Sequence, residues 1–159
     1  MSLSMTRAQR EAFLAGLHVG VLAIPDPGRG PLAAPIWYGY EPGGEIFVIT
    51  GATSRKGKLL RPGVRVSLAA QSEAAPYQYV SVEGPVSSVE PARDREQVRA
   101  LARRYLGETG GDAYTAATWR SYAEDPNVLV RIRPERWLTV DYTSEIGRAS
   151  CRERVYVLV

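Results

Sequence analysis

The chain has 159 residues, a mass of 17.4 kDa and a formal net charge of +3, with 45% apolar and 23% charged residues. This length and composition predict a single globular domain and exclude collagen-like, coiled-coil and disordered chains. Only one cysteine (Cys151) and one histidine (His18) are present, so we expect no intramolecular disulfide and no metal site. No apolar run has the roughly 20 residues of a membrane helix, so we expect a cytoplasmic protein without a membrane partner.

The hydrophobic pattern predicts an antiparallel β protein with helices at its periphery. The turns between the first three predicted strands are too short for parallel crossovers. Gly84-Pro85, inside the longest predicted strand, indicates a bulge or a bend at a barrel edge. In chain order, we expect a helix over 6–17, strands over 19–24, 32–40 and 45–50, a short helix over 54–60, strands over 64–70 and 77–89, a helix over 92–106, a weaker helix over 114–123, and strands over 128–132 and 137–142.

The two ends of the chain do not follow this pattern. We interpret residues 1–4 as a leader in front of a domain that spans residues 5–144. Residues 145–159 fit neither a strand nor a helix, and they resemble vector-derived read-through found on unrelated proteins. We interpret them, Cys151 included, as a tail foreign to the domain; a native tail is the alternative.

The positive charge is carried almost entirely by arginine, because the 20 basic residues include only two lysines, Lys56 and Lys58. Acidic residues interleave with the arginines, so no basic stripe is present and no nucleic-acid partner is expected. Both lysines lie in one pentapeptide, Ser54-Arg55-Lys56-Gly57-Lys58. This segment is either a solvated turn or a place where the protein requires an ammonium group.

The segment after the third predicted strand suits an anion. The strand ends at Thr50, and a short helix begins near Ser54 and carries Arg55 and Lys56. The first turn of a helix offers unpaired N–H groups, a guanidinium can bind phosphate through two hydrogen bonds, and an ammonium adds a point charge. Hydroxyl groups of Thr50, Thr53 and Ser54 could complete the shell. The pattern predicts a site for a phosphate monoester.

The same segment is not a P-loop. Five residues separate Gly51 from Gly57, and Leu59 stands where a P-loop has the Ser or Thr that holds magnesium. The chain also lacks a G-x-G-x-x-G segment after a strand and a G-x-S-x-G segment. Nucleoside triphosphate, Rossmann-type and serine-hydrolase chemistry are therefore not expected.

Two segments together resemble the pyridoxamine 5′-phosphate oxidase family. They are residues 49–60, with Ile49-Thr50 and the pentapeptide that begins at Ser54, and the run Val82-Glu83-Gly84-Pro85-Val86 after the next strand pair. By the order and spacing of elements, the resemblance covers roughly residues 6–142. It implies the FMN-binding split-barrel fold, which is a mainly β, α+β architecture with an antiparallel Greek-key barrel and peripheral helices.

The resemblance also implies which residues bind the cofactor. Arg55 and Lys56 would hold the phosphate of FMN, the strand end at 49–50 would touch the flavin, and the preceding strand would lie along its ring. Tyr79 stands where the family has a glutamine. The implied cofactor-binding residues are Ala34, Pro35, Ile36, Trp37, Ile49, Thr50, Ser54, Arg55, Lys56 and Tyr79. No catalytic residue is implied, and the aromatic side chains are as consistent with barrel packing as with cofactor contact.

Several positions depart from the pattern of the oxidase itself. Ala34 stands where the family offers an arginine to the flavin, and the C-terminal Trp and Arg-x-His segment that hold the vitamer phosphate have no counterpart. Pyridoxamine phosphate is therefore not the expected substrate. Residues 35–37 and 75–79 are more similar to the branch of the superfamily that uses the deazaflavin coenzyme F-420 in place of FMN.

Two classes of function remain open at this point. The first is an oxidoreductase that transfers a hydride between bound FMN, or the deazaflavin, and a small organic substrate, with the chemistry supplied by the cofactor ring. The second is a flavin-binding or flavin-storage protein without catalytic activity. In either case the resemblance implies a homodimer with two equivalent cofactor sites across a two-fold interface.

Overall fold

The computed structural model describes residues 3–119 and 126–143. The end of the helix predicted over 114–123 and the suspected tail over 145–159 lie outside the described residues. In chain order, the described elements are α1 (Arg7–Ala15), β1 (Gly20–Ile24), β2 (Leu32–Ile36), β3 (Tyr38–Gly39), β4 (Ile46–Gly51), α2 (Arg55–Leu59), β5 (Arg65–Gln71), β6 (Gln78–Pro91), α3 (Arg95–Trp119), β7 (Asn127–Ile132) and β8 (Arg136–Asp141).

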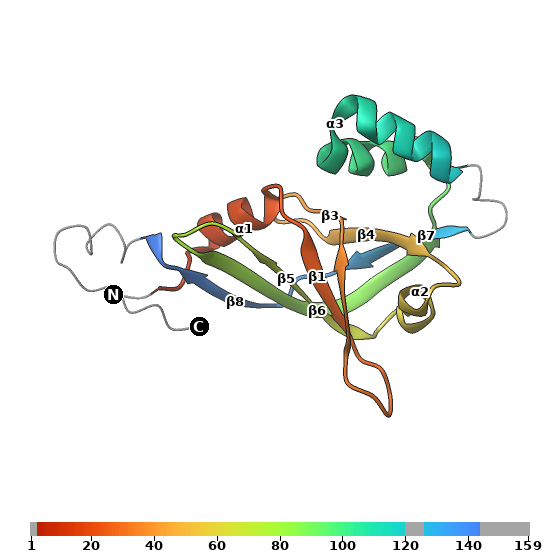
Figure 1. The fold of residues 1–159 in the computed structure, drawn as a ribbon. Helices are drawn as coiled ribbons and strands as arrows, with labels where there is room; N and C mark the ends of the chain where they lie inside the picture. The colour runs from red at the N-terminus through yellow and green to blue at the C-terminus, as the bar shows by residue number, and fades with distance from the viewer. Residues whose placement is uncertain (1–2, 120–125, 144–159) are drawn as a thin grey trace.

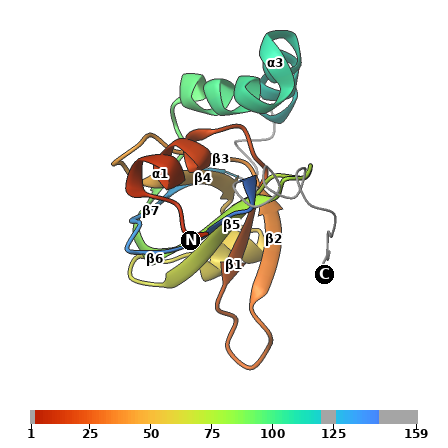
Figure 2. The ribbon, with the colours of Figure 1, turned by 90° about the vertical axis from the view of Figure 1, so that its left-hand side faces the viewer.

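The strands form one curled antiparallel sheet, with three helices outside it (Figures 1 and 2). The strand order is β2-β1-β5-β6-β7-β4-β3, and β8 pairs with β6. Each pair of described neighbours is antiparallel, and for β1 and β2 the short connection predicted this. The architecture is the predicted α+β split barrel. None of the described helices combines the length and the apolar character that crossing a membrane would require.

Strand β6 organises the sheet because it changes partner along its length. Its first half, from Gln78 to Glu83, pairs with β8, and its second half, from Val86 onward, pairs with β7. The change falls at the Gly84-Pro85 step, and the register with β7 shifts between Val86 and Ser88. The predicted irregularity of β6 is therefore present, but the register shift lies just beyond the Gly84-Pro85 step.

The barrel core is built from the alternating apolar positions of the strands. The inward side chains of β1 and β4, such as Leu22 and Val48, are fully buried, and α1 adds Leu14. Helix α1 begins with a capping box: the Thr6 hydroxyl accepts from the Gln9 N–H at 3.3 Å, and the Gln9 side chain accepts from the Thr6 N–H at 2.8 Å. This cap directs the helix onto the barrel, where its apolar face closes the core.

The strand predicted over 32–40 is not continuous, which corrects that prediction. It breaks at Trp37 into β2, which pairs with β1, and β3, which pairs with β4. The hydroxyl of Tyr105 in α3 accepts from the Tyr38 N–H at 3.1 Å and lies 3.0 Å from the Tyr38 carbonyl. A side chain from a distant helix thus satisfies backbone groups at the break, and local sequence cannot reveal this.

Helix α3 folds back on itself at Gly107, which has a φ of 73°. Close packing joins its two halves, because a Cβ on Gly111 would lie 2.5 Å from the Arg103 backbone nitrogen. The Arg103 guanidinium also donates two hydrogen bonds of 2.7 Å to Asp112, and this bonding lowers the pKa of that carboxyl. The described parts of the helices predicted over 92–106 and 114–123 therefore belong to one hairpin, which lies on the same side of the sheet in both views (Figures 1 and 2).

Residues at the start of the described chain lie along β8. The Asp141 N–H donates to the Leu3 carbonyl at 2.8 Å, and the Met5 N–H donates to the Thr139 hydroxyl at 3.0 Å. Met5 is buried. The segment that precedes α1 thus contacts the barrel already at residue 3.

Candidate functional site

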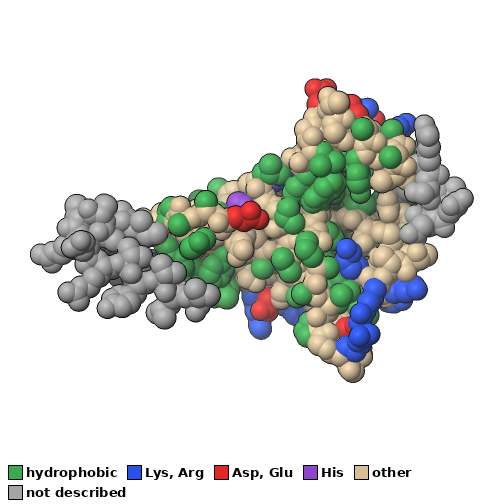
Figure 3. Space-filling view, in the orientation of Figure 1, with side chains coloured by type: hydrophobic (Ala, Val, Ile, Leu, Met, Phe, Trp, Pro, Cys, Tyr) green, Lys and Arg blue, Asp and Glu red, His purple; other side chains and the backbone are tan. Residues whose placement is uncertain are grey.

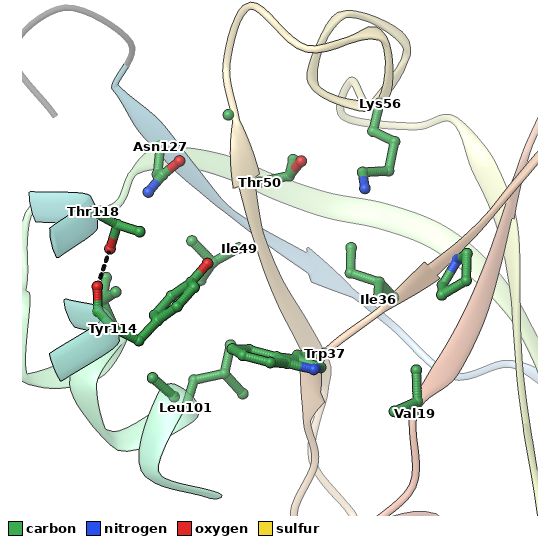
Figure 4. Close-up of a pocket in the computed structure, with 14 residues that line it drawn as sticks. Val19, Ile36, Trp37, Ile49, Thr50, Lys56, Leu101, Tyr114, Thr118 and Asn127 are labelled. Atoms are coloured by element: carbon green, nitrogen blue, oxygen red, sulfur yellow. Dashed lines mark hydrogen bonds between the residues drawn. The ribbon is translucent and has the colours of Figure 1, made fainter. Parts of the chain in front are cut away.

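A pocket of about 430 Å³ opens between the broken strand β2–β3, the end of β4, helix α2 and the hairpin of α3 (Figure 4). Its volume lies in the range of small-molecule sites, about 300–1,000 Å³. The residues that line it are Val19, Pro35, Ile36, Trp37, Ile49, Thr50, Gly51, Lys56, Val98, Leu101, Ala102, Tyr114, Thr118 and Asn127.

Lys56 reaches into this pocket from α2, and its ammonium group points toward the cavity (Figure 4). Among the described residues that line the pocket it is the only charged one. No carboxylate in residues 3–119 or 126–143 forms an ion pair with it. The arrangement leaves a positive charge available to an anionic group in the pocket.

The loop before Lys56 is held tightly. The Ser54 hydroxyl donates to the Gly51 carbonyl at 2.6 Å and accepts from the Gly57 N–H at 3.0 Å, so it caps α2, which begins where the sequence predicted. Gly57 is required by space, because a Cβ there would lie 2.2 Å from the Gly51 carbonyl oxygen. Thr50 is buried and its Oγ1 lies 3.3 Å from the Ser54 hydroxyl. These contacts fix the point from which the Lys56 side chain extends.

Arg55 is not in the pocket lining. Its guanidinium forms a salt bridge with Asp26 in the turn between β1 and β2, and its side chain is 48% exposed. Successive residues of a short helix point in different directions, so Arg55 reaches Asp26 while Lys56 reaches the pocket. Lys58 is exposed and also lies outside the lining.

The site residues predicted on the strands also fall into two groups, those that line the pocket and those that do not. Pro35, Ile36 and Trp37 line the pocket together with Ile49 and Thr50. Ala34 does not line it. Tyr79 lines a separate hollow, which contains Tyr105. Of the ten residues named from the sequence, the structure therefore brings six together around one cavity and places Ala34, Ser54, Arg55 and Tyr79 outside its lining.

Helix α3 contributes a wall that sequence reasoning did not assign to the site. Leu101 comes from its first half, and Tyr114 and Thr118 come from its second half. Trp37 stacks on Tyr105 with ring centroids 5.1 Å apart and meets Tyr114 at 5.3 Å. The apolar periodicity of the first half predicted a buried face, but it carried no information about which surface that face covers.

The chain belongs to the pyridoxamine 5′-phosphate oxidase family, whose model matches residues 6–139. This confirms the resemblance inferred from the two sequence segments. A comparison with curated proteins found no match.

Several solved structures have a similar fold. A conserved hypothetical protein from Mycobacterium tuberculosis has a TM-score of 0.66 and 24% identity, over 99% of this chain and 94% of that one. An F-420 reductase has a TM-score of 0.64 and 22% identity, over 80% and 94%. A FAD-binding protein from Mesorhizobium loti has a TM-score of 0.56 and 19% identity, over 86% and 93%. At these identities the likeness shows the fold.

Proposed function

We propose that the protein is an oxidoreductase that binds a phosphorylated flavin-type cofactor, FMN or the deazaflavin F-420, in the pocket lined by Lys56. The observation that carries this proposal is a single ammonium group at one side of a pocket whose other described lining residues are neutral. Family membership and the F-420 reductase and FAD-binding proteins among the structural neighbours support it.

The pocket residues fit such a cofactor by their chemistry. Lys56 and the Thr50 hydroxyl offer a charge and a hydrogen bond to a phosphate, while Ile36, Trp37 and Leu101 offer apolar surface to a ring system. When bound, the ring system would supply the capacity to accept or donate a hydride. The hairpin of α3 covers one side of the pocket and would exclude water there.

The test is a titration of the purified protein with FMN, with F-420 and with riboflavin, followed by turnover assays. We expect saturable binding of at least one phosphorylated cofactor, with a changed visible spectrum, and hydride transfer to or from a small organic substrate. Binding without turnover over a broad panel of NAD(P)H and electron acceptors would favour the flavin-storage function. Absence of binding by all three compounds would contradict the proposal.

The cofactor site is proposed to be completed by a second copy of the chain. An exposed apolar patch, made of Leu17, Val19 and Val21, borders the pocket: the three side chains are 60%, 50% and 42% exposed, and Val19 also lines the pocket. Hydrophobic side chains gather on the face below α3 (Figure 3). Apolar surface of this kind marks an interaction site, and a two-fold homodimer would bury it over more than about 1,000 Å².

Val21→Lys should disrupt this dimer, because it would place two unpaired charges in a buried interface. We expect dimer dissociation to become about 100-fold easier or more, measured by analytical ultracentrifugation with and without cofactor. Leu106→Lys, which changes an exposed apolar residue outside the patch, is the control and should leave the dimer intact. A parent protein that sediments as a 17.4 kDa monomer with cofactor bound would rule the dimer out.

A further inference from the structure

A second cavity, of about 470 Å³, lies between α1, the turn that joins β3 to β4, and the connection from β7 to β8. It shares no lining residue with the cofactor pocket. Arg10 of α1, Tyr40 just after β3 and Trp137 of β8 contribute to its wall. The described lining contains three arginines and three glutamates, so its formal charge is balanced.

Two of the three arginines are already paired. Arg7 forms a salt bridge of 2.9 Å with Glu11, and Arg133 contacts Glu135 at 3.3 Å. Glu135 is further engaged by Arg65 at 2.7 Å. These ion pairs compensate the positive charges of Arg7 and Arg133, so neither arginine is available to bind an anionic ligand.

Arg10 is different from the other two. Its guanidinium lies over the ring of Trp137, 4.7 Å from the centroid, and it forms no hydrogen bond or ion pair with the part of the chain that the structure describes. Its Nε is buried and has no acceptor. Buried donors are nearly always paired because an unmade hydrogen bond is costly, and a guanidinium presents a fork that matches a carboxylate.

The surroundings of Arg10 define the kind of acceptor. Tyr40 meets Trp137 edge to face, with ring centroids 6.2 Å apart, and burial raises the pKa of Tyr40 above its ordinary value. Glu45 also lines the cavity and has no ion-pair partner among the described residues. A ligand with two negative charges would be disfavoured, because Glu45 would repel the charge that Arg10 does not bind. The apolar part of a ligand with one negative charge could pack against the aromatic rings of Tyr40 and Trp137.

We propose that this cavity is a second ligand site, which binds a small organic monocarboxylate through Arg10 and packs the apolar part of the ligand beside Tyr40 and Trp137. The site does not depend on the cofactor pocket or on the oxidoreductase assignment. The carboxylate would accept from the terminal nitrogens of the Arg10 guanidinium, because the Nε itself is buried, and Arg10 remains stacked on Trp137 when it donates.

Calorimetric titration with benzoate tests the proposal, with tryptophan fluorescence as a second signal. We expect one saturable site per chain and binding at least about tenfold weaker in Arg10→Gln. Arg29→Gln is the matched control, since Arg29 is exposed and lies outside the cavity lining, and it should change the affinity less than about threefold. Glu45→Gln should strengthen benzoate binding, because it removes a repelling charge, and a purely structural role of Arg10 would not produce that gain.

Several outcomes would overturn the proposal. These are no saturable binding of benzoate up to about 10 mM, equal affinity in the parent and in Arg10→Gln, and inorganic phosphate binding as tightly as benzoate. Loss of benzoate binding in Lys56→Ala would also overturn it, because the ligand would then occupy the cofactor pocket. If Arg10→Gln does not fold, Arg10→Lys decides: weaker binding supports the proposal and unchanged binding refutes it, since Lys keeps the charge but not the fork.

Discussion

Lys56→Ala is expected to weaken the binding of FMN or F-420 by roughly 10- to 150-fold, which corresponds to the loss of one charge-assisted contact of about 1.5–3 kcal/mol. The reason is that no other charged side chain in the described part of the pocket lining can replace Lys56. Fluorescence titration of the purified protein with each cofactor measures the change. Lys56→Arg should recover only part of the affinity, because a planar fork does not replace a point charge in a tight loop.

Neighbouring basic residues provide the controls. Lys58→Ala should leave the affinity unchanged, because Lys58 is exposed and outside the lining. Arg55→Ala should have a smaller effect than Lys56→Ala, since Arg55 pairs with Asp26. Riboflavin lacks the phosphate, so it should bind more weakly than FMN, and the Lys56 substitution should hardly change its affinity. Equal losses for FMN and riboflavin would show that Lys56 supports the fold, and the phosphate assignment would then be abandoned.

Gly84→Ala should destabilise the barrel by about 3 kcal/mol, because overpacking against rigid backbone is not relieved by a side-chain rotation. A Cβ at this position would lie 1.7 Å from the Arg133 carbonyl oxygen and 2.8 Å from its carbon. This contact occurs where β6 passes from β8 to β7, so relief would require the β7–β8 connection to move away from β6. The melting temperature should fall by about 6–12 °C for a chain of this size.

Gly30→Ala is the control for this substitution. A Cβ on Gly30 would meet no heavy atom within 4 Å, and the φ of Gly30 is not positive, so alanine there should be neutral or slightly stabilising, within about 1 kcal/mol. Both variants would be compared with the parent by thermal and urea unfolding followed by circular dichroism. Equal stability of Gly84→Ala and the parent would mean that the close approach of residues 84 and 133 is not part of the fold in solution.

The sequence by itself determined the features that depend on neighbouring residues. Alternating apolar positions predicted the strands, and Thr6 and Ser54 predicted the starts of α1 and α2. Gly84-Pro85 predicted the irregularity in β6. The placement of both lysines in one segment of an arginine-rich chain indicated the loop from which Lys56 enters the pocket. Each of these signals is local, because capping, turn formation and strand alternation are decided within a few residues.

Tertiary structure alone decided which of the candidates share a cavity. Arg55 turns to Asp26, 29 residues away in sequence, and the break at Trp37 is held by Tyr105 from α3. The hairpin of α3 supplies Tyr114 to the cofactor pocket, and the packing of α1 against β8 stacks Arg10 on Trp137. These arrangements result from contacts between segments far apart in the chain. Local periodicity shows that one face of a helix or strand is apolar. Which segment packs against that face depends on how the whole barrel closes.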